Sequence, residues 1–114
     1  MVTFSCKKIS QEELIRCAFN LNKTEYNILM FLLKNNKKYT VSQISQIMKL
    51  DRTTIQKAIK NLTNEELVKR RQINLSAGGY MFFYKINDKN EIKNKIKKII
   101  YEWYKHVEEA INKL

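Results

Sequence analysis

Two adjacent amphipathic segments between Thr40 and Val68 constrain the fold of this chain more than any other feature. In TVSQISQIMKLDRTTIQKAIKNLTNEELV, apolar residues recur at offsets of three and four, which places each set on one face of a short helix. The two sets are Val41, Ile44, Ile47 and Met48, and then Ile55, Ala58, Ile59 and Leu62. Ser42 and Asp51 stand where an N-cap is expected. We therefore predict two short helices joined by a tight turn over residues 41–64.

The outer face of the second helix, residues 51–64, carries no acidic side chain between Arg52 and Asn64. Its polar residues are Arg52, Thr53, Gln56, Lys57, Lys60 and Asn61. Side chains of these types hydrogen-bond base edges and phosphates, so the face suits the major groove of DNA. The alternative is the solvated face of an ordinary bundle helix, but such faces normally mix charges of both signs.

The charge of the chain is concentrated around these helices. The net charge is +11, and residues 34–71 contain ten basic and three acidic side chains. Such a surface suits a polyanion, most commonly nucleic acid. A membrane surface is the competing polyanion, but it would require a basic amphipathic segment free to leave the fold. No window is long and apolar enough for a signal peptide or a bilayer span, so we expect a cytoplasmic protein without a membrane partner.

Enzymatic and metal-dependent functions find little support in the sequence. The only histidine is His106, and the two cysteines, Cys6 and Cys17, form no CxxC motif. These residues cannot assemble a nucleophilic triad or a zinc site. We expect reduced thiols, no cofactor, no metal and no catalysis.

Two further helices precede the pair. Ser10 with Glu13, and Asn22 with Glu25, have the spacing of capping boxes and predict helices over residues 10–20 and 22–34. The second of these is apolar nearly all round, which is typical of a core helix. Tyr39 is expected to begin a short extended segment.

From Leu67 the apolar period changes from 3.6 to 2. LVKRRQINLS and YMFFYKI flank a Gly78-Gly79 turn, which predicts a β-hairpin. Its first strand is basic through Lys69, Arg70 and Arg71. The aromatic residues of the second strand alternate, so we expect at least half of Phe82, Phe83 and Tyr84 to lie in the core, which argues against RNA stacking.

The C-terminal segment, residues 88–114, predicts one long helix, capped by Asp88 with Glu91. One apolar seam runs along it, formed by Ile92, Ile96, Ile99, Trp103, Val107, Ala110, Ile111 and Leu114. A seam on a helix of roughly 35 Å is more than a small domain can cover. We expect it to pack mainly against a second copy, and in part against the first helices of its own chain.

This order of elements resembles the dimeric winged helix-turn-helix transcriptional regulators, and most closely their archaeal MarR-like and TrmB-like members. The resemblance covers residues 21–86, including LNKTEYNILMFLL, the helix pair and the hairpin, which is the wing of this family. It implies a mainly α fold with a small β-hairpin (α+β), with a DNA-binding domain over residues 1–87 (wing 67–87) and a dimerisation helix over 88–114. The family usually has glycine where this chain has Glu66, so either Asn64 or Glu66 must adopt a left-handed conformation.

The resemblance implies sequence-specific binding of double-stranded DNA by a homodimer on an inverted repeat, with the wing (68–86) on the adjacent minor groove or backbone. We expect Thr53, Gln56 and Lys57 to read bases. The expected backbone contacts are Ser42, Gln43, Arg52, Thr54, Lys60 and Asn61, and those of the wing are Lys69, Arg70, Arg71, Gly78 and Gly79. A protein–protein interaction module of a transcription or replication assembly remains the alternative. Whether a small effector binds between the domain and the dimer helix is left open. The residues that could line such a pocket are Tyr26, Cys17, Tyr101, Trp103 and Tyr104.

Overall fold

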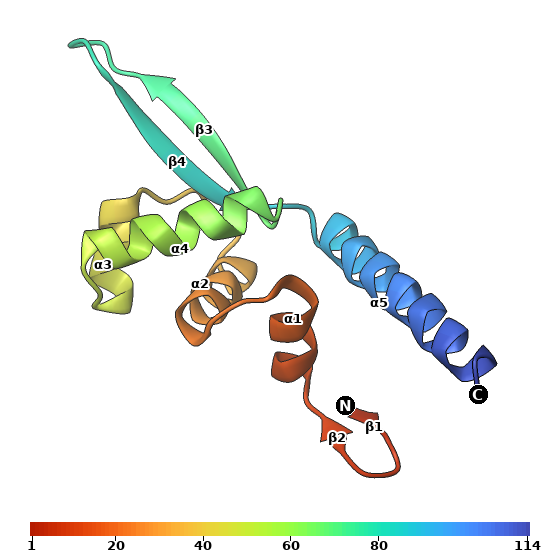
Figure 1. Ribbon diagram of the computed structural model, residues 1–114. Coiled ribbons are helices and arrows are strands. Elements are labelled where there is room, and N and C mark those ends of the chain that lie inside the picture. Colours follow the sequence, from red (N-terminus) through yellow and green to blue (C-terminus); the bar gives the residue numbers. More distant parts are fainter.

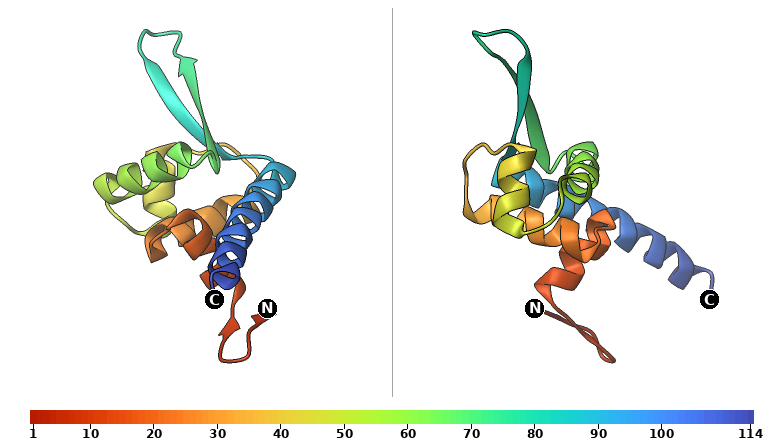
Figure 2. Two further views of the ribbon diagram at one scale, coloured as in Figure 1. Left: turned by 45° about the vertical axis from the view of Figure 1, so that its right-hand side comes forward. Right: turned by 90° about the vertical axis from the view of Figure 1, so that its left-hand side faces the viewer.

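The computed structural model describes all residues, 1–114, as five helices and two small antiparallel hairpins (Figure 1). The elements are β1 (Val2–Thr3), β2 (Lys8–Ile9), α1 (Gln11–Phe19), α2 (Lys23–Lys34), α3 (Val41–Met48), α4 (Arg52–Asn64), β3 (Val68–Asn74), β4 (Tyr80–Ile86) and α5 (Lys89–Asn112). The molecule is elongated, measuring 66 × 24 × 22 Å, because the β3–β4 hairpin and α5 both project from the helical body (Figure 2). The predicted fold class, mainly α with a small β-hairpin, is confirmed.

The hydrophobic core forms where α2, α3 and α4 meet the base of the β3–β4 hairpin. Its fully buried side chains are Ile28, Leu29 and Leu32 of α2, Ile44 of α3, Ile55, Ile59 and Leu62 of α4, and Leu67 and Val68. Helical periodicity placed the buried residues of α2, α3 and α4 inward, but it was wrong for Ile47 of α3, which is 47% exposed. Since burying one such side chain contributes about 1.5–3 kcal/mol, this cluster holds α4 in a single orientation, with its polar side outward.

The start of α3 differs from the prediction that Ser42 is an N-cap. Thr40 caps the helix instead, because its Oγ1 accepts from the backbone N–H of Gln43 at 3.1 Å. The Gln43 Oε1 accepts from the backbone N–H of Thr40 at 2.9 Å, which completes a capping box. A capping box requires glutamine or glutamate three residues after the cap. Thr40 is followed by Gln43 at this spacing, whereas Ser42 is followed by Ser45. Ser42 therefore lies exposed in the first turn.

Three helices end with a non-glycine residue in the left-handed region, followed by a leucine whose N–H reaches a carbonyl five residues back. The left-handed residues are Asn20, Lys49 and Glu66, with φ of 53°, 56° and 59°. The corresponding bonds are Leu21 N to Arg16 O, Leu50 N to Ser45 O and Leu67 N to Leu62 O. At the end of α4 it is Glu66, not Asn64, that takes this conformation, and the buried Leu67 anchors the turn in the core.

A hydrogen-bonded junction joins α4, the β3–β4 hairpin and α5. The buried Asn87 donates from its side-chain amide to the Glu66 carbonyl at 2.8 Å and from its backbone N–H to the Leu67 carbonyl at 3.0 Å. Its Oδ1 accepts from the N–H of Asp88, the N-cap of α5, at 2.8 Å. Lys95 of α5 contacts the Glu66 carboxylate at 2.7 Å. The direction in which α5 leaves the domain is therefore set by the end of α4.

The β3–β4 hairpin runs in register from Val68 opposite Ile86 to Asn74 opposite Tyr80. Gly78 and Gly79 have φ of +95° and +82°, which confirms the predicted glycine turn. The expected extended segment is also present, since Tyr39 pairs with Tyr84 through two backbone hydrogen bonds of 2.9 and 2.8 Å. The hairpin is thus fastened to the domain near its base, while its far end is free in every view (Figure 2).

The expectation that at least half of the second-strand aromatics lie in the core was wrong. Of Phe82, Phe83 and Tyr84, only Tyr84 packs against the core, and the other two remain half-buried. Burial does not alternate along β4, since Phe82, Phe83 and Tyr84 are all half-buried, because the ribbon extends beyond the helices. No second layer exists there to cover either face.

The long helix α5 packs on its own domain only near its start. Ile92 is buried, and Ile96 and Ile99 pack against the core beside α1. Further along, Trp103 and Ile111 are 55% and 57% exposed. The N-terminal β1–β2 hairpin, which the sequence analysis did not predict, is two residue pairs long and mostly exposed. Short strands of this kind carry no periodic signal.

The left-handed conformation of Glu66 gives a stability prediction. Glu66→Ala and Glu66→Gly both remove the contact with Lys95, but only glycine also relieves the strain of positive φ. We expect the glycine variant to be more stable than the alanine variant by about 1 kcal/mol in urea denaturation. Equal midpoints would show that the turn stores no strain.

Candidate nucleic-acid interface

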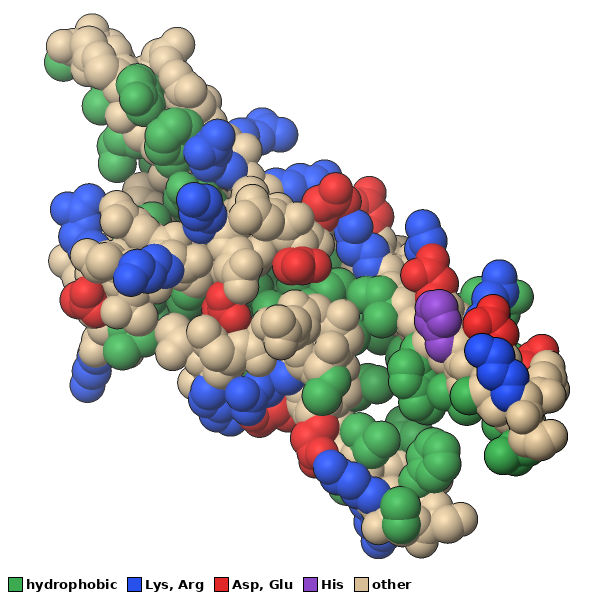
Figure 3. Space-filling model, in the orientation of Figure 1, with side chains coloured by type: hydrophobic (Ala, Val, Ile, Leu, Met, Phe, Trp, Pro, Cys, Tyr) green, Lys and Arg blue, Asp and Glu red, His purple; other side chains and the backbone are tan.

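The outer face of α4 offers a row of polar side chains to solvent. Arg52, Thr53, Gln56, Lys57 and Lys60 are all exposed, on the side of α4 away from its buried apolar residues. Figure 3 shows basic side chains on α4 and at the base of the β3–β4 hairpin. None of the five takes part in a hydrogen bond or an ion pair within the protein, which leaves them available to a ligand.

The N-terminus of α4 is organised by Asp51 and Thr54. Asp51 is the N-cap residue, as predicted, but its carboxylate accepts from the Thr54 hydroxyl and makes no side-chain bond to the first-turn N–H groups. That hydroxyl lowers the pKa of Asp51, and the nearby charge of Lys57 lowers it further. Asp51 is therefore ionised at neutral pH. Thr54, an expected backbone contact, has its hydroxyl engaged within the protein.

Asn61 is also engaged within the protein, although the sequence analysis expected it to contact the DNA backbone. Its side-chain amide donates to Oε2 of Glu25, a carboxylate that is only 5% exposed and belongs to α2. The other oxygen of Glu25 accepts from the backbone N–H of Asn22 at 2.9 Å. Asn61 thus satisfies a buried charge and fixes α4 against α2. Sequence spacing could not reveal this pair, which joins positions 36 residues apart.

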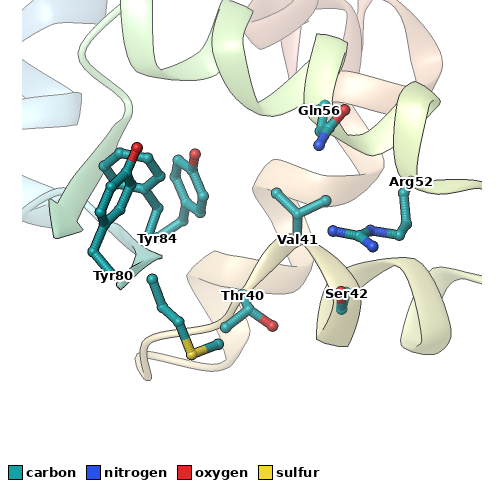
Figure 4. Close-up of a pocket in the computed structure, with 9 residues that line it drawn as sticks. Thr40, Val41, Ser42, Arg52, Gln56, Tyr80 and Tyr84 are labelled. Carbon is teal, nitrogen blue, oxygen red and sulfur yellow. The ribbon is translucent and has the colours of Figure 1, made fainter. Parts of the chain in front are cut away.

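A groove of about 270 Å3 lies between the start of α3, the start of α4 and strand β4. Arg52 and Gln56 reach into it from α4, Ser42 lies at the first turn of α3, and Tyr80 and Tyr84 stand on the opposite side (Figure 4). The first-turn N–H groups of a helix carry partial positive charge. The groove therefore joins a cation, backbone donors and aromatic rings, which are the groups that bind a sugar–phosphate strand.

A second groove, of about 390 Å3, continues along α4 toward the hairpin base. It is lined by Gln56, Lys60, Thr63, Asn64, Arg70 and Tyr84. The Arg70 guanidinium lies over the ring of Phe82, 4.5 Å from its centroid, and is held there by a cation–π contact. The predicted basic strand and the predicted outer face of α4 therefore line one continuous surface.

The opposite face of the hairpin is basic as well. Lys69 stands directly across from Lys85 in the strand register, and neither has an acidic partner. Like charges directly opposite one another destabilise a strand pair unless a counter-charge intervenes. Lys38 adds a further cation over the ring of Phe83. The sequence analysis missed Lys85 and Lys38, and strand pairing with Lys69 is the signal that would have indicated Lys85.

The residues proposed for other chemistry do not assemble into a site. No group of three or more His, Cys, Asp or Glu side chains could hold a metal ion. Both cysteines are free and exposed. Tyr26 packs against the core, whereas Tyr101, Trp103 and Tyr104 are more than half exposed, so these aromatics do not enclose an effector pocket in a single chain. No helix is both long enough and apolar enough to cross a membrane.

The core consists of α2, α3 and α4, α4 has an exposed polar face without acidic side chains, and a basic hairpin is attached to it. These features define a winged helix-turn-helix protein of the DNA-binding regulator class. Comparison with known families assigns the chain more narrowly. Residues 15–90 match the family described as "Sugar-specific transcriptional regulator TrmB", and the chain belongs to this family. It is a transcriptional regulator by family and not an enzyme.

Individual relatives are similar to this chain over most of its length. A protein of Methanosarcina mazei Go1, described as a possible transcriptional regulator, has a solved structure that superimposes with a TM-score of 0.92 at 35% identity, covering 99% of this chain and 95% of that one. An uncharacterized protein of Methanocaldococcus jannaschii is 31% identical over 109 residues, which is 96% of this chain and 82% of the relative. The ST1889 protein of Sulfolobus tokodaii shares the fold, with a TM-score of 0.71 at 21% identity over 85% of this chain and 94% of that one.

The contact between Asn61 and Glu25 gives a second prediction. Asn61→Ala leaves one oxygen of a buried carboxylate without its donor, so we expect the free energy of unfolding to fall by about 1–3 kcal/mol. Lys60→Ala, one residue earlier on the exposed face, is the matched control and should change stability by less than about 0.5 kcal/mol. Equal stability of the two variants would show that Asn61 does not stabilise the fold through Glu25, and it would then be available as a DNA contact.

Proposed function

We propose that this regulator binds double-stranded DNA in a sequence-specific manner as a homodimer, with α4 in the major groove and the β3–β4 hairpin on the adjacent minor groove or backbone. The observation that carries this proposal is the row of five unpaired polar side chains on α4, which joins the basic hairpin through the two grooves. A surface with so many cations and so few internal partners is stabilised by a polyanion.

Base reading is assigned to Thr53, Gln56 and Lys57. Recognition helices contact bases through their N-terminal half, and these three lie in the first two turns of α4 with exposed side chains. Gln pairs with adenine and Lys with guanine in the major groove, while the threonine methyl suits thymine.

The DNA backbone is assigned to the residues around the grooves. Ser42 and Arg52 flank the first groove. The amide nitrogen of Gln43, in the first turn of α3, remains a free donor because only its oxygen serves the capping box. Lys60 and Arg70 flank the second groove. The proposal gives Thr54 and Asn61 a positioning role instead, since both are bonded within the domain. On the hairpin, Lys69 and Arg71 supply phosphate contacts on the other face.

A homodimer is proposed because the distal half of α5 exposes apolar side chains that its own chain does not cover. The exposed members are Ile100, Trp103, Tyr104, Ile111 and Leu114. Hydrophobic side chains of α5 and of the N-terminal hairpin also face each other across an open gap (Figure 3). A second α5 would fill such a gap with matching apolar surface. Two copies of α4 about 34 Å apart would then meet successive turns of an inverted repeat.

Lys57 and Lys60 test the assignment of bases and backbone. Lys57→Ala should weaken binding to a specific duplex by about 1–3 kcal/mol and to random duplex by less. Lys60→Ala should weaken both alike and reduce the slope of log K against log salt by about one. Titration by fluorescence anisotropy at several salt concentrations measures both effects. Failure of the unmodified protein to bind any duplex at low salt would refute the proposed function.

The dimer is tested by placing one carboxylate on each side of α5. Trp103→Glu puts a charge into the proposed seam, whereas Asn94→Glu puts the same charge on the opposite, exposed face. Burying an unpaired carboxylate costs about 3 kcal/mol or more, so we expect the first variant to raise the dimer dissociation constant about a hundredfold. Sedimentation should show twice the 13.7 kDa chain mass for the second variant only. A monomeric unmodified protein would contradict the dimer.

A further inference from the structure

The outer half of the β3–β4 hairpin is uncharged, although its inner half is strongly basic. From Gln72 to Tyr84 the chain contains no Asp, Glu, Lys or Arg. The cations of the two strands are Lys69, Arg70, Arg71 and Lys85, all in the half nearer the core. Figure 3 shows the same change along the hairpin, with hydrophobic and uncharged side chains toward its tip. The tip is therefore not built to bind a row of phosphates by charge.

Apolar side chains are exposed at this tip. Leu75 is 43% exposed, and Met81, which also lines the first groove with Thr40 and Val41, is 39% exposed. Neither belongs to the hydrophobic core or packs against it. Leu75 is held in place by the turn, because its N–H donates to the Gly79 carbonyl at 3.0 Å and its carbonyl accepts from the Gly78 N–H at 3.1 Å. A leucine fixed at the end of a projecting ribbon is costly to expose to water. It is well placed to enter a partner.

We propose that Leu75 and Met81 form an apolar wedge that enters the minor groove beside the recognised half-site, partly unstacks one base step and bends the duplex. Leu and Met are among the side chains that minor-groove proteins insert between bases. This proposal rests on the proposed DNA binding by α4 and adds a distortion of the DNA to it.

The dimensions of the hairpin support insertion of side chains at its tip. Seven residues at about 3.3 Å each carry the chain roughly 23 Å from the buried Val68 to the tip, less than one turn of DNA. The minor groove is about 6 Å wide, which is too narrow for the ribbon but admits a single side chain. Neither Gly78 nor Gly79 has any atom within 4 Å of the place where a Cβ would stand, so the turn can approach the sugar–phosphate closely.

We favour DNA over a protein partner because the tip adjoins the surface that is proposed to bind nucleic acid. The cations at the hairpin base and the grooves beside α4 would bring the backbone alongside the hairpin, with the tip directly beyond. A wedge should also prefer steps that unstack readily, namely TA and CA/TG. We therefore expect one such step at a fixed position outside each half-site.

The test compares Leu75→Ser/Met81→Ser with Ser76→Ala on a duplex recovered by selection from a random pool. Ser76 lies in the same loop, so Ser76→Ala controls for substitution at the tip without removing the wedge. End-to-end energy transfer measures the bend, and 2-aminopurine at the flanking step measures unstacking. We expect the unmodified protein and Ser76→Ala to bend the duplex by about 20–90° and to raise the 2-aminopurine fluorescence. The double variant should lose both effects and bind about tenfold more weakly.

Each other outcome contradicts part of the account in a distinguishable way. A folded double variant, judged by its circular dichroism, that still bends and unstacks the duplex would overturn the wedge. So would an unmodified protein that binds without distorting the DNA. A change in oligomeric mass without a change in bend would assign the tip to a protein contact and equally overturn it. Absence of binding by the unmodified protein would refute the proposed function itself.

Discussion

The turn at the end of α4 is the constraint on which the arrangement of this molecule depends. Glu66 in the left-handed conformation reverses the chain, and the buried Leu67 and Asn87 hold the reversal in the core. The carbonyls of Glu66 and Leu67 accept from Asn87, whose own side chain accepts from the first capping residue of α5. One junction thus sets the angles between α4, the β3–β4 hairpin and α5. The proposed dimer would need those angles to be fixed in order to match two half-sites.

The outer surface carries cations that repel one another and have no acidic partner. Cations stand on both faces of the hairpin and along α4, and Lys69 lies across from Lys85 without a counter-charge. Two acidic groups near this surface are engaged within the protein, since Asp51 accepts from Thr54 and Glu66 contacts Lys95, which lowers the pKa of each carboxyl group. The repulsion that remains is relieved when phosphates enter. Binding should therefore depend strongly on salt, because each phosphate contact releases counterions.

Much of the fold could be predicted from the sequence because it follows from short-range rules. Helical periodicity located α2, α3 and α4, and the Gly-Gly turn located the hairpin. Two of the errors arose where distant residues or missing layers decide the outcome. Glu25 captures Asn61 across 36 positions, and the ribbon leaves Phe82 without a covering layer. The cap at Thr40 was misplaced because two hydroxyl residues compete locally and only the capping box distinguishes them. The base-reading residues and the dimer remain predictions.

Selection of bound duplexes from a random pool, followed by footprinting of the enriched sequences, tests the central claim most directly. Two copies of α4 held by a shared α5 seam should enrich an inverted repeat whose half-site centres lie about 10 base pairs apart, with protection centred on two successive major grooves. Enrichment of a single asymmetric half-site would contradict the dimer. Recovery of the starting pool without enrichment would contradict sequence-specific recognition by α4.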